Sequence, residues 1–369
     1  MSRRKLFSGR EIYNHEKSDS LFLEAVKKNI LYHKSNCREY EEILDSMDFH
    51  INDLTSMEDL YKLPSIPTMY LKTHYLASMS KRRLLVKATS TGTSGTYSRI
   101  GYNFLSLFYG AVMAWKLLQF HGLFSLKRTN YILLGYEPHR SNETIITKTQ
   151  LLSTFMAPAK QRVYALQYKD HGYEVNFDDI KNALDQYSRQ KNPVRLIGFP
   201  YYTLFLLKEL KKNQISYQLP KGSMVLLGGG WKGFYQEETE KETLFQMIRE
   251  ILGIEEENCR EFFGAAEHPV LYCTCPNHHF HVSNYSRVII RDVMSLEPVK
   301  NGQPGLVNLM TPMADSMPLT SIMTDDLGVL YDGNQCGCGI ETPYLEILGR
   351  IGMKEIQTCA VNAADLLGE

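Results

Sequence analysis

The sequence predicts an α/β protein in which short buried strands alternate with helices. Short apolar runs recur from Leu84 onward, and segments with helical spacing separate them. After Tyr285 the pattern changes to short strands and turns, which indicates an antiparallel subdomain. The length of 369 residues allows a deep core and suggests two or three domains.

Residues 1–83 are predicted to form a helical N-terminal layer. Phe22, Val26 and Ile30 recur at helical spacing, and the two prolines of the Leu63–Pro67 segment interrupt the pattern. The longest apolar stretch, Phe104 to Phe120, is shorter than the ~20 residues that a membrane span needs. It therefore predicts a buried helix and no membrane span.

Residues 84–348 are predicted to form the α/β core, with the β subdomain at about 285–348. Strands are expected in the runs LLVKATS, YILLGY, VRLIGFP, MVLLGGG and REFFGAA, then in VIIRD, GLVNLM and MTDDLGVLYDG. Helices are expected over 104–120, 202–212 and 238–252. Residues 349–369 are predicted to form a hinge and a short tail.

The charge balance, the N-terminal pattern and the cysteine count argue against several classes of function and location. Lys plus Arg equals Asp plus Glu at 41 each, so no global field favours nucleic acid or an anionic membrane. The N-terminus has no apolar segment typical of a secretory signal, so the cytoplasm is the expected location. Seven cysteines are an odd number, which favours free thiols, metal ligands or chemistry over a disulfide framework.

A hydroxyl-rich glycine loop follows the first strand-like run. Its residues are Ser90, Thr91, Gly92, Thr93, Ser94, Gly95 and Thr96. Backbone N–H groups and hydroxyls at this density can hold phosphate oxygens without a fixed charge. A polar surface turn is the alternative, since the same residue types form turns.

A second glycine segment, Gly228 to Gly233, fits the G-x-G-x-x-G pattern of dinucleotide-binding proteins and follows a strand-like run. Gly229 and Gly230 are therefore candidate nucleotide-binding residues. The pattern also makes a nicotinamide-dependent oxidoreductase an alternative function for this protein. A tight turn between strand and helix would produce the same pattern.

Cysteines and histidines gather in two short segments. The first runs from Cys273 to His281 in the order Cys-Thr-Cys-Pro-Asn-His-His-Phe-His, and the second is Cys336-Gly-Cys338. Thiolates and imidazoles that folding brings together would suit a tetrahedral zinc site. Unliganded thiols and surface histidines are the alternative.

Three further segments carry a family resemblance: Phe263-Gly-Ala-Ala-Glu267, Thr324-Asp-Asp326 and Gly349-Arg350. Together with the glycine loops, they resemble motifs of the adenylate-forming enzymes, and most closely the acyl-protein synthetases of the LuxE type. The resemblance spans roughly Leu63 to the C-terminus.

The resemblance implies specific roles. The Ser90–Thr96 loop would bind the phosphates of ATP, Phe263 and Gly264 would lie against adenine, and Glu267 would hold Mg²⁺. Asp326 would bind the ribose hydroxyls. Phenylacetate-CoA ligase relatives carry a similar cysteine and histidine arrangement, which selects Cys275, His281, Cys336 and Cys338 as ligands of a structural Zn²⁺.

The sequence also departs from the wider superfamily. Ala266 stands where a threonine is expected, and the chain ends about 20 residues past Gly349, so the C-terminal domain with its catalytic lysine is expected to be missing. Lys232 is a candidate replacement cation. In acyl-protein synthetases the acyl group passes to a cysteine near the C-terminus, which is Cys359 here, and Arg350 is a candidate cation to favour its thiolate.

The expected reaction is ATP-dependent activation of a carboxylic acid, with a fatty acid as the expected substrate, as acyl-AMP, followed by transfer to a cysteine of the protein itself. The partner would be a protein that transfers or reduces the acyl group. An acyl- or aryl-CoA ligase and a non-catalytic nucleotide-binding subunit stay open as further alternatives.

Overall fold

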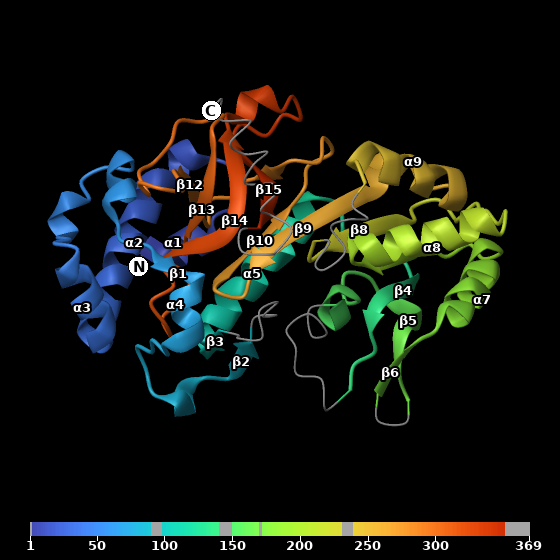
Figure 1. Cartoon of the computed structure of the whole chain (residues 1–369), viewed down its shortest axis with the longest axis horizontal. Helices are drawn as coiled ribbons and strands as arrows, with labels where there is room; N and C mark the ends of the chain where they lie inside the picture. The colour runs from blue at the N-terminus through green and yellow to red at the C-terminus, as the bar shows by residue number, and fades with distance from the viewer. Residues whose placement is uncertain (1, 90–97, 140–149, 170–171, 231–238, 351–369) are drawn as a thin grey trace. The chain divides into compact units, whose positions relative to one another are not determined.

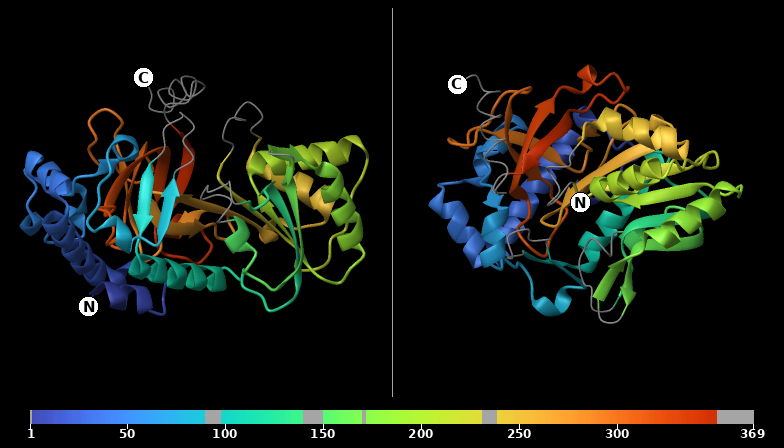
Figure 2. Two further views of the ribbon diagram at one scale, coloured as in Figure 1. Left: turned by 90° about the horizontal axis from the view of Figure 1, so that it is seen from below. Right: turned by 45° about the vertical axis from the view of Figure 1, so that its right-hand side comes forward.

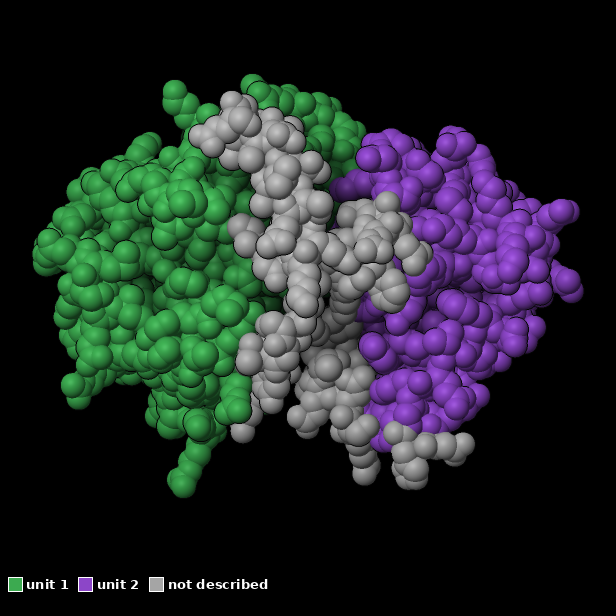
Figure 3. All heavy atoms as spheres, in the orientation of Figure 1, with its two compact units in different colours: residues 1–117, 264–369 green, residues 118–263 purple. Residues whose placement is uncertain are grey.

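The computed structural model describes residues 2–89, 98–139, 150–169, 172–230 and 239–350. The chain forms two compact units (Figure 3). Unit 1 contains residues 1–117 and 264–369, and unit 2 contains residues 118–263. In the sequence, unit 2 is thus an insertion within unit 1.

Unit 1 begins with a layer of helices (Figure 1). They are α1 (Ser2–Ser8), α2 (His15–Asn36), α3 (Arg38–Ser46) and α4 (Thr68–Thr73), with 3₁₀ turns at Ile51–Asp53, Glu58–Lys62 and Lys81–Arg83. The Asn14 side chain accepts a hydrogen bond from the backbone N–H of Lys17 and so caps α2. Phe22, Val26 and Ile30 lie on the buried face of α2, as their helical spacing predicts.

The N-terminal helices are bonded to segments that lie far along the chain. The Asn29 side-chain amide donates to the Ala314 carbonyl at 2.8 Å, and an imidazole nitrogen of His33 lies 3.1 Å from the same oxygen. Arg3 pairs with Asp315, with its Nη2 2.6 Å from Oδ2. Because these groups are buried or half-buried, the helical layer and the C-terminal part of the chain form one core.

Helix α5 (Phe104–Phe120) confirms the predicted helix but not its burial. Only the stripe of Ser106, Tyr109, Met113 and Leu117 is buried, whereas Phe104 and Trp115 are 71% and 51% exposed. A stripe repeating every three to four residues covers one face of a helix, so an apolar run does not by itself require burial on all sides. No helix in the described part of the chain combines the length and the apolar character of a membrane span.

The larger sheet of unit 1 has the order β11-β15-β14-β13-β12, and the short β1 pairs in parallel with β14. Its strands are β1 (Ile66–Pro67), β11 (Phe280–His281), β12 (Arg287–Arg291), β13 (Pro304–Met310), β14 (Ser321–Tyr331) and β15 (Tyr344–Arg350). All neighbours other than β1 and β14 are antiparallel, which confirms the predicted antiparallel subdomain. A separate ribbon of β2 (Val86–Thr89) and β3 (Arg99–Tyr102) is visible in Figure 2 (left, cyan).

Unit 2 is built on a mainly parallel sheet with the order β9-β8-β7-β4-β5-β6. The strands are β4 (Thr129–Tyr136), β5 (Ala159–Lys169), β6 (Gly172–Val175), β7 (Val194–Gly198), β8 (Met224–Gly228) and β9 (Cys259–Ala265). β9 continues into unit 1, where β10 (His268–Cys273) follows it in the same sheet. Among the strand pairs described in unit 2, β6 with β5 is antiparallel and the others are parallel.

Among the described residues, α7 (Phe177–Ser188), α8 (Pro200–Lys212) and α9 (Lys241–Leu252) pack on this sheet. Ile180, Leu207 and Ile248, one from each helix, share a core with Ile132 of β4 and Val225 of β8. The alternation of buried strand and helix predicted from the sequence is therefore confirmed in this unit.

Candidate functional site

Cys275, His281, Cys336 and Cys338 meet in unit 1. One ligand atom from each lies within 4.8 Å of every other, and the first three residues are buried. The Cys275 and Cys336 sulfurs are 3.5 Å apart, and His281 Nε2 is 3.2 Å from the Cys338 sulfur. Ligands around a tetrahedral zinc ion are separated by roughly 3.5–3.8 Å, so the donor set and its spacing fit zinc.

Local backbone geometry explains how these side chains meet. His281 lies in β11, opposite Tyr344 of β15, and this pairing places the first segment beside the second. Gly337 has a φ of 72°, a left-handed conformation that glycine adopts without strain. A tight Cys-Gly-Cys turn can thus direct two thiols toward one point.

The protonation states at this cluster also suit a metal. His281 Nδ1 lies 2.7 Å from the Thr342 carbonyl oxygen, to which it donates a hydrogen bond. In the neutral ring Nε2 is then unprotonated, and its lone pair can bind a metal ion. Burial lowers the pKa of His281, which favours the neutral imidazole. Burial and the neighbouring thiols raise the pKa of Cys336 to about 12, and a bound cation would reverse this shift by stabilising the thiolate.

A further histidine at this cluster was not selected from the sequence. His279 Nδ1 lies 3.1 Å from the Cys336 sulfur, and its Nε2 lies 3.3 Å from a carboxylate oxygen of Glu346. Its ring stacks on Tyr344. Its place in the Cys273–His281 segment made it a candidate, but only the fold shows which contacts it makes.

Glu267, Asp325 and Asp326 bring negative charge together elsewhere in unit 1. Glu267 is only 4% exposed and follows Ala266, whose carbonyl accepts a hydrogen bond from the Tyr102 hydroxyl at 2.6 Å. Burial raises the pKa of Asp326, the charges of Asp325 and Glu267 raise it further, and Arg350 opposes them. One buried and two half-buried carboxylates in mutual range of repulsion favour a cation, which fits the expected Mg²⁺.

Arg350 and Asp326 are paired across two strands. They lie opposite each other in β15 and β14, with Arg350 Nε 3.5 Å from an Asp326 oxygen. Asp325 is held separately, by the Thr68 hydroxyl at 3.0 Å and by Lys72 at 3.8 Å. The Gly349-Arg350 pair that the resemblance places at a hinge is thus the end of a paired strand.

The second glycine segment lies in unit 2, at the carboxyl end of β8. Gly229 and Gly230 have φ values of 83° and 66°. A Cβ on Gly229 would lie 2.5 Å from a ring carbon of Phe199, so this position has no room for a side chain. Phe263 is partly buried and Gly264 is exposed along β9.

Several predicted residues lie outside the described part of the chain. They are Ser90, Thr91, Gly92, Thr93, Ser94, Gly95 and Thr96 of the first loop, Lys232 of the second glycine segment, and Cys359 of the tail. Their predicted roles remain predictions.

Comparison with solved structures shows the fold. The chain is similar to 2-hydroxyisobutyryl-CoA ligase, crystallised in the postadenylation state, with a TM-score of 0.65 at 14% identity over 93% of this chain and 70% of that chain. An open conformation of the same ligase gives a TM-score of 0.64. The predicted fold class, that of the adenylate-forming enzymes, is thereby confirmed.

Comparison of sequences shows the family. A long-chain-fatty-acid–luciferin-component ligase of Aliivibrio fischeri is 22% identical over 96% of this chain and 91% of its own length, and that of Vibrio harveyi is 23% identical over 91% and 85%. The sequence model of the family "Acyl-protein synthetase, LuxE" matches residues 6–367. Because that match covers nearly the whole chain, the protein belongs to the LuxE family of acyl-protein synthetases, which are AMP-forming ligases.

Proposed function

We propose that the protein activates a fatty acid as acyl-AMP and then carries the acyl group as a thioester on Cys359. The family match over residues 6–367 supports this proposal, as do the names of the two luciferin-component ligases. A partner protein would then take or reduce the acyl group.

In the first step a carboxylate oxygen of the acid attacks the α-phosphorus of ATP. The bond from that phosphorus to the bridging oxygen breaks, and pyrophosphate leaves. The Ser90–Thr96 loop would hold the phosphates, and Phe263, Gly264, Gly229 and Gly230 would contact the nucleotide. Most of the rate enhancement would come from positioning and charge neutralisation.

Glu267 would hold the Mg²⁺ that neutralises the phosphate charge, and Asp326 would accept hydrogen bonds from the ribose hydroxyls. Lys232 and Arg350 would add positive charge near the reacting groups. In the second step the Cys359 thiolate attacks the acyl carbon, its proton having gone to solvent, and AMP leaves with the electrons of the broken carbon–oxygen bond.

We also propose that Cys275, His281, Cys336 and Cys338 hold one Zn²⁺. Four protein ligands leave no open position for water, so the ion would be structural. Its effect would be to tie β11 to the turn that contains Cys336.

The first test of this function is acid-dependent exchange of labelled pyrophosphate into ATP, measured across a panel of carboxylic acids. Exchange that requires a long-chain acid would support the adenylate step and its substrate class. If no acid supports exchange but NADH binds saturably, the oxidoreductase alternative replaces this proposal.

Glu267→Gln should lower the pyrophosphate exchange rate about a hundredfold or more, because a metal ion supplies several kcal/mol of transition-state stabilisation. The fold should be unchanged by this isosteric substitution. Circular dichroism checks the fold, and exposed Glu297→Gln serves as the matched control. Equal exchange rates for the two variants would remove Glu267 from the site.

Asp326→Asn should weaken ATP binding by about tenfold while leaving the melting temperature equal or higher. Since burial raises the pKa of Asp326, its charged form destabilises the folded protein above that pKa, and asparagine removes this cost. Calorimetric titration with ATP and thermal denaturation at pH 7 measure the two effects. Unchanged affinity would contradict the ribose-binding role.

A further inference from the structure

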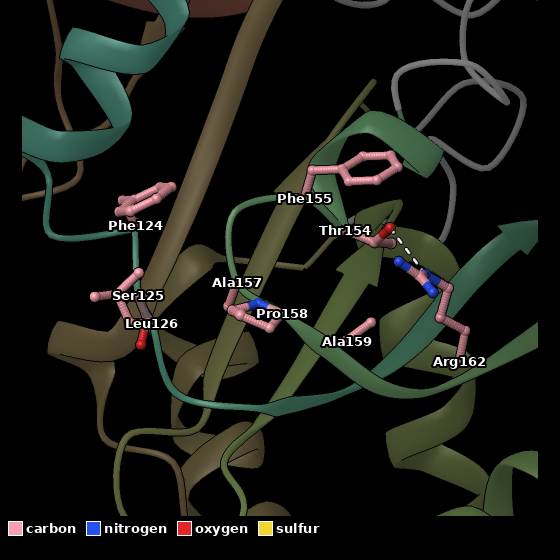
Figure 4. Close-up of a pocket in the computed structure, with 9 residues that line it drawn as sticks. All are labelled: Phe124, Ser125, Leu126, Thr154, Phe155, Ala157, Pro158, Ala159 and Arg162. Carbon is pink, nitrogen blue, oxygen red and sulfur yellow. Dashed lines mark hydrogen bonds between the residues drawn. The ribbon is translucent and has the colours of Figure 1, made fainter.

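A pocket of about 370 Å³ lies in unit 2, at the amino ends of β4 and β5 (Figure 4). Phe124 and Leu126, just before β4, form one side, and Phe155 and Pro158, just before β5, form another. The volume is within the range of small-molecule sites.

The walls are largely apolar and unusually exposed. Leu126 is 83% exposed and Phe155 is 64% exposed, and Phe120 and Leu152 add two more exposed large side chains in the neighbouring sequence. Water-exposed apolar surface of this kind is costly and marks a binding site more often than an ordinary surface. An apolar ligand is therefore favoured.

One wall carries a positive charge without an acidic partner. Arg162 Nε donates to the Thr154 hydroxyl at 2.9 Å, and its guanidinium lies 5.8 Å from the centre of the Phe155 ring. Arg162 is exposed and contacts Thr154 and Phe155, and within the described ranges no carboxylate pairs with it and no acidic residue lines the pocket. With Nε engaged, the two Nη groups remain as the fork that binds a carboxylate in bidentate fashion.

A second positively charged side chain, that of Arg195, contacts the segment that leads into the pocket. Arg195 is 3% exposed, and its Nη2 donates to the carbonyl of Leu123, the residue before Phe124. Its guanidinium also interacts with the Tyr131 hydroxyl, and no carboxylate among the described residues pairs with it. A buried cation without a paired acid makes an anion nearby more favourable.

The pocket is distinct from the proposed nucleotide site. Gly229 and Gly230 follow the carboxyl end of β8, whereas the pocket lies at the amino ends of strands in the same parallel sheet. A strand of five residues separates the two edges by roughly 16 Å. Nucleotide chemistry on such sheets takes place at the carboxyl edge.

We propose that this pocket is a second acid site, which binds a carboxylic acid with a long apolar chain at Arg162 without activating it. The apolar walls would contact the chain, and the guanidinium would bind the carboxylate. The site does not depend on the proposed reaction, which uses the other edge of the sheet.

The test uses a fatty acid that carries a diazirine, its methyl ester, and the full-length protein without ATP. After irradiation, mass spectrometry of peptides should find the acid on the segments around Phe124 and Phe155. Arg162→Gln should lower this labelling by tenfold or more, since a charge-assisted hydrogen bond is lost. The ester should label the wild type and Arg162→Gln equally.

Lys160→Gln is the matched control, because Lys160 is an exposed cation in the same strand that does not line the pocket. It should label as the wild type does. Pyrophosphate exchange by Arg162→Gln should be normal, so failure of this site and failure of the adenylate step are separate results. Equal labelling by acid and ester, or labelling only outside these segments, would overturn the proposal and leave the exposed apolar surface for a protein partner.

Discussion

Cys336→Ser should remove zinc from the protein and unfold the subdomain around it. Wild-type protein is expected to contain about one zinc per chain. Structural zinc sites in small peptides contribute ~10 kcal/mol or more of apparent binding free energy, which is comparable to the whole stability of many domains. Elemental analysis should therefore show metal content near zero, and thermal denaturation should show an early transition.

The matched control is Cys273→Ser. Cys273 is 1% exposed and close in sequence to Cys275, but it is not part of the four-residue cluster. This variant measures the cost of a buried hydroxyl, about 1–3 kcal/mol, without loss of a ligand. If both variants melt alike and neither protein contains metal, the zinc proposal is wrong.

Cys359→Ala should abolish the acyl label on the protein while acid-dependent pyrophosphate exchange continues. Acyl-AMP forms without this thiol, but no nucleophile then receives the acyl group. The measurement uses a radiolabelled fatty acid with ATP, followed by hydroxylamine, which releases thioesters. The expected loss of the label is complete.

Two further variants sharpen this result. Cys37→Ala removes a buried thiol in the N-terminal helical layer and should retain full labelling. Cys359→Ser should acquire the label slowly as an oxygen ester, because a hydroxyl is far less ionised than a thiol. Normal labelling of Cys359→Ala would place the acceptor elsewhere, and release of acyl-CoA by the wild type would favour the CoA-ligase alternative.

The sequence predicts those strands of unit 2 that are buried on both faces. β4, β7 and β8 appear as continuous apolar runs because helices and sheet neighbours cover them. β5, which lies inside the sheet between β4 and the edge strand β6, did not give such a run. β5 mixes exposed and buried positions along Ala159–Lys169, so neither alternation nor an apolar run reveals it.

Two segments rich in cysteine and histidine are visible in the sequence, and the resemblance to phenylacetate-CoA ligase relatives selected the four candidate ligands within them. The environment of these ligands could not be predicted. The Thr342 carbonyl fixes the His281 ring only because β11 pairs with β15, and that pairing depends on the fold of the whole subdomain. For the same reason, nothing in the sequence indicated that Asp326 faces Arg350.

The division of unit 1 into two separate stretches of chain determines when its core can form during synthesis. His33 is bonded to Ala314, 281 residues later. At the usual pace of translation the ribosome needs roughly 15–55 s to cover that distance. Meanwhile residues 118–263, which form unit 2 without a break, emerge in full and can fold first. Until their partners are synthesised, the apolar faces of the N-terminal helices stay uncovered. The nascent chain therefore exposes aggregation-prone surface at its N-terminal end, which is synthesised first.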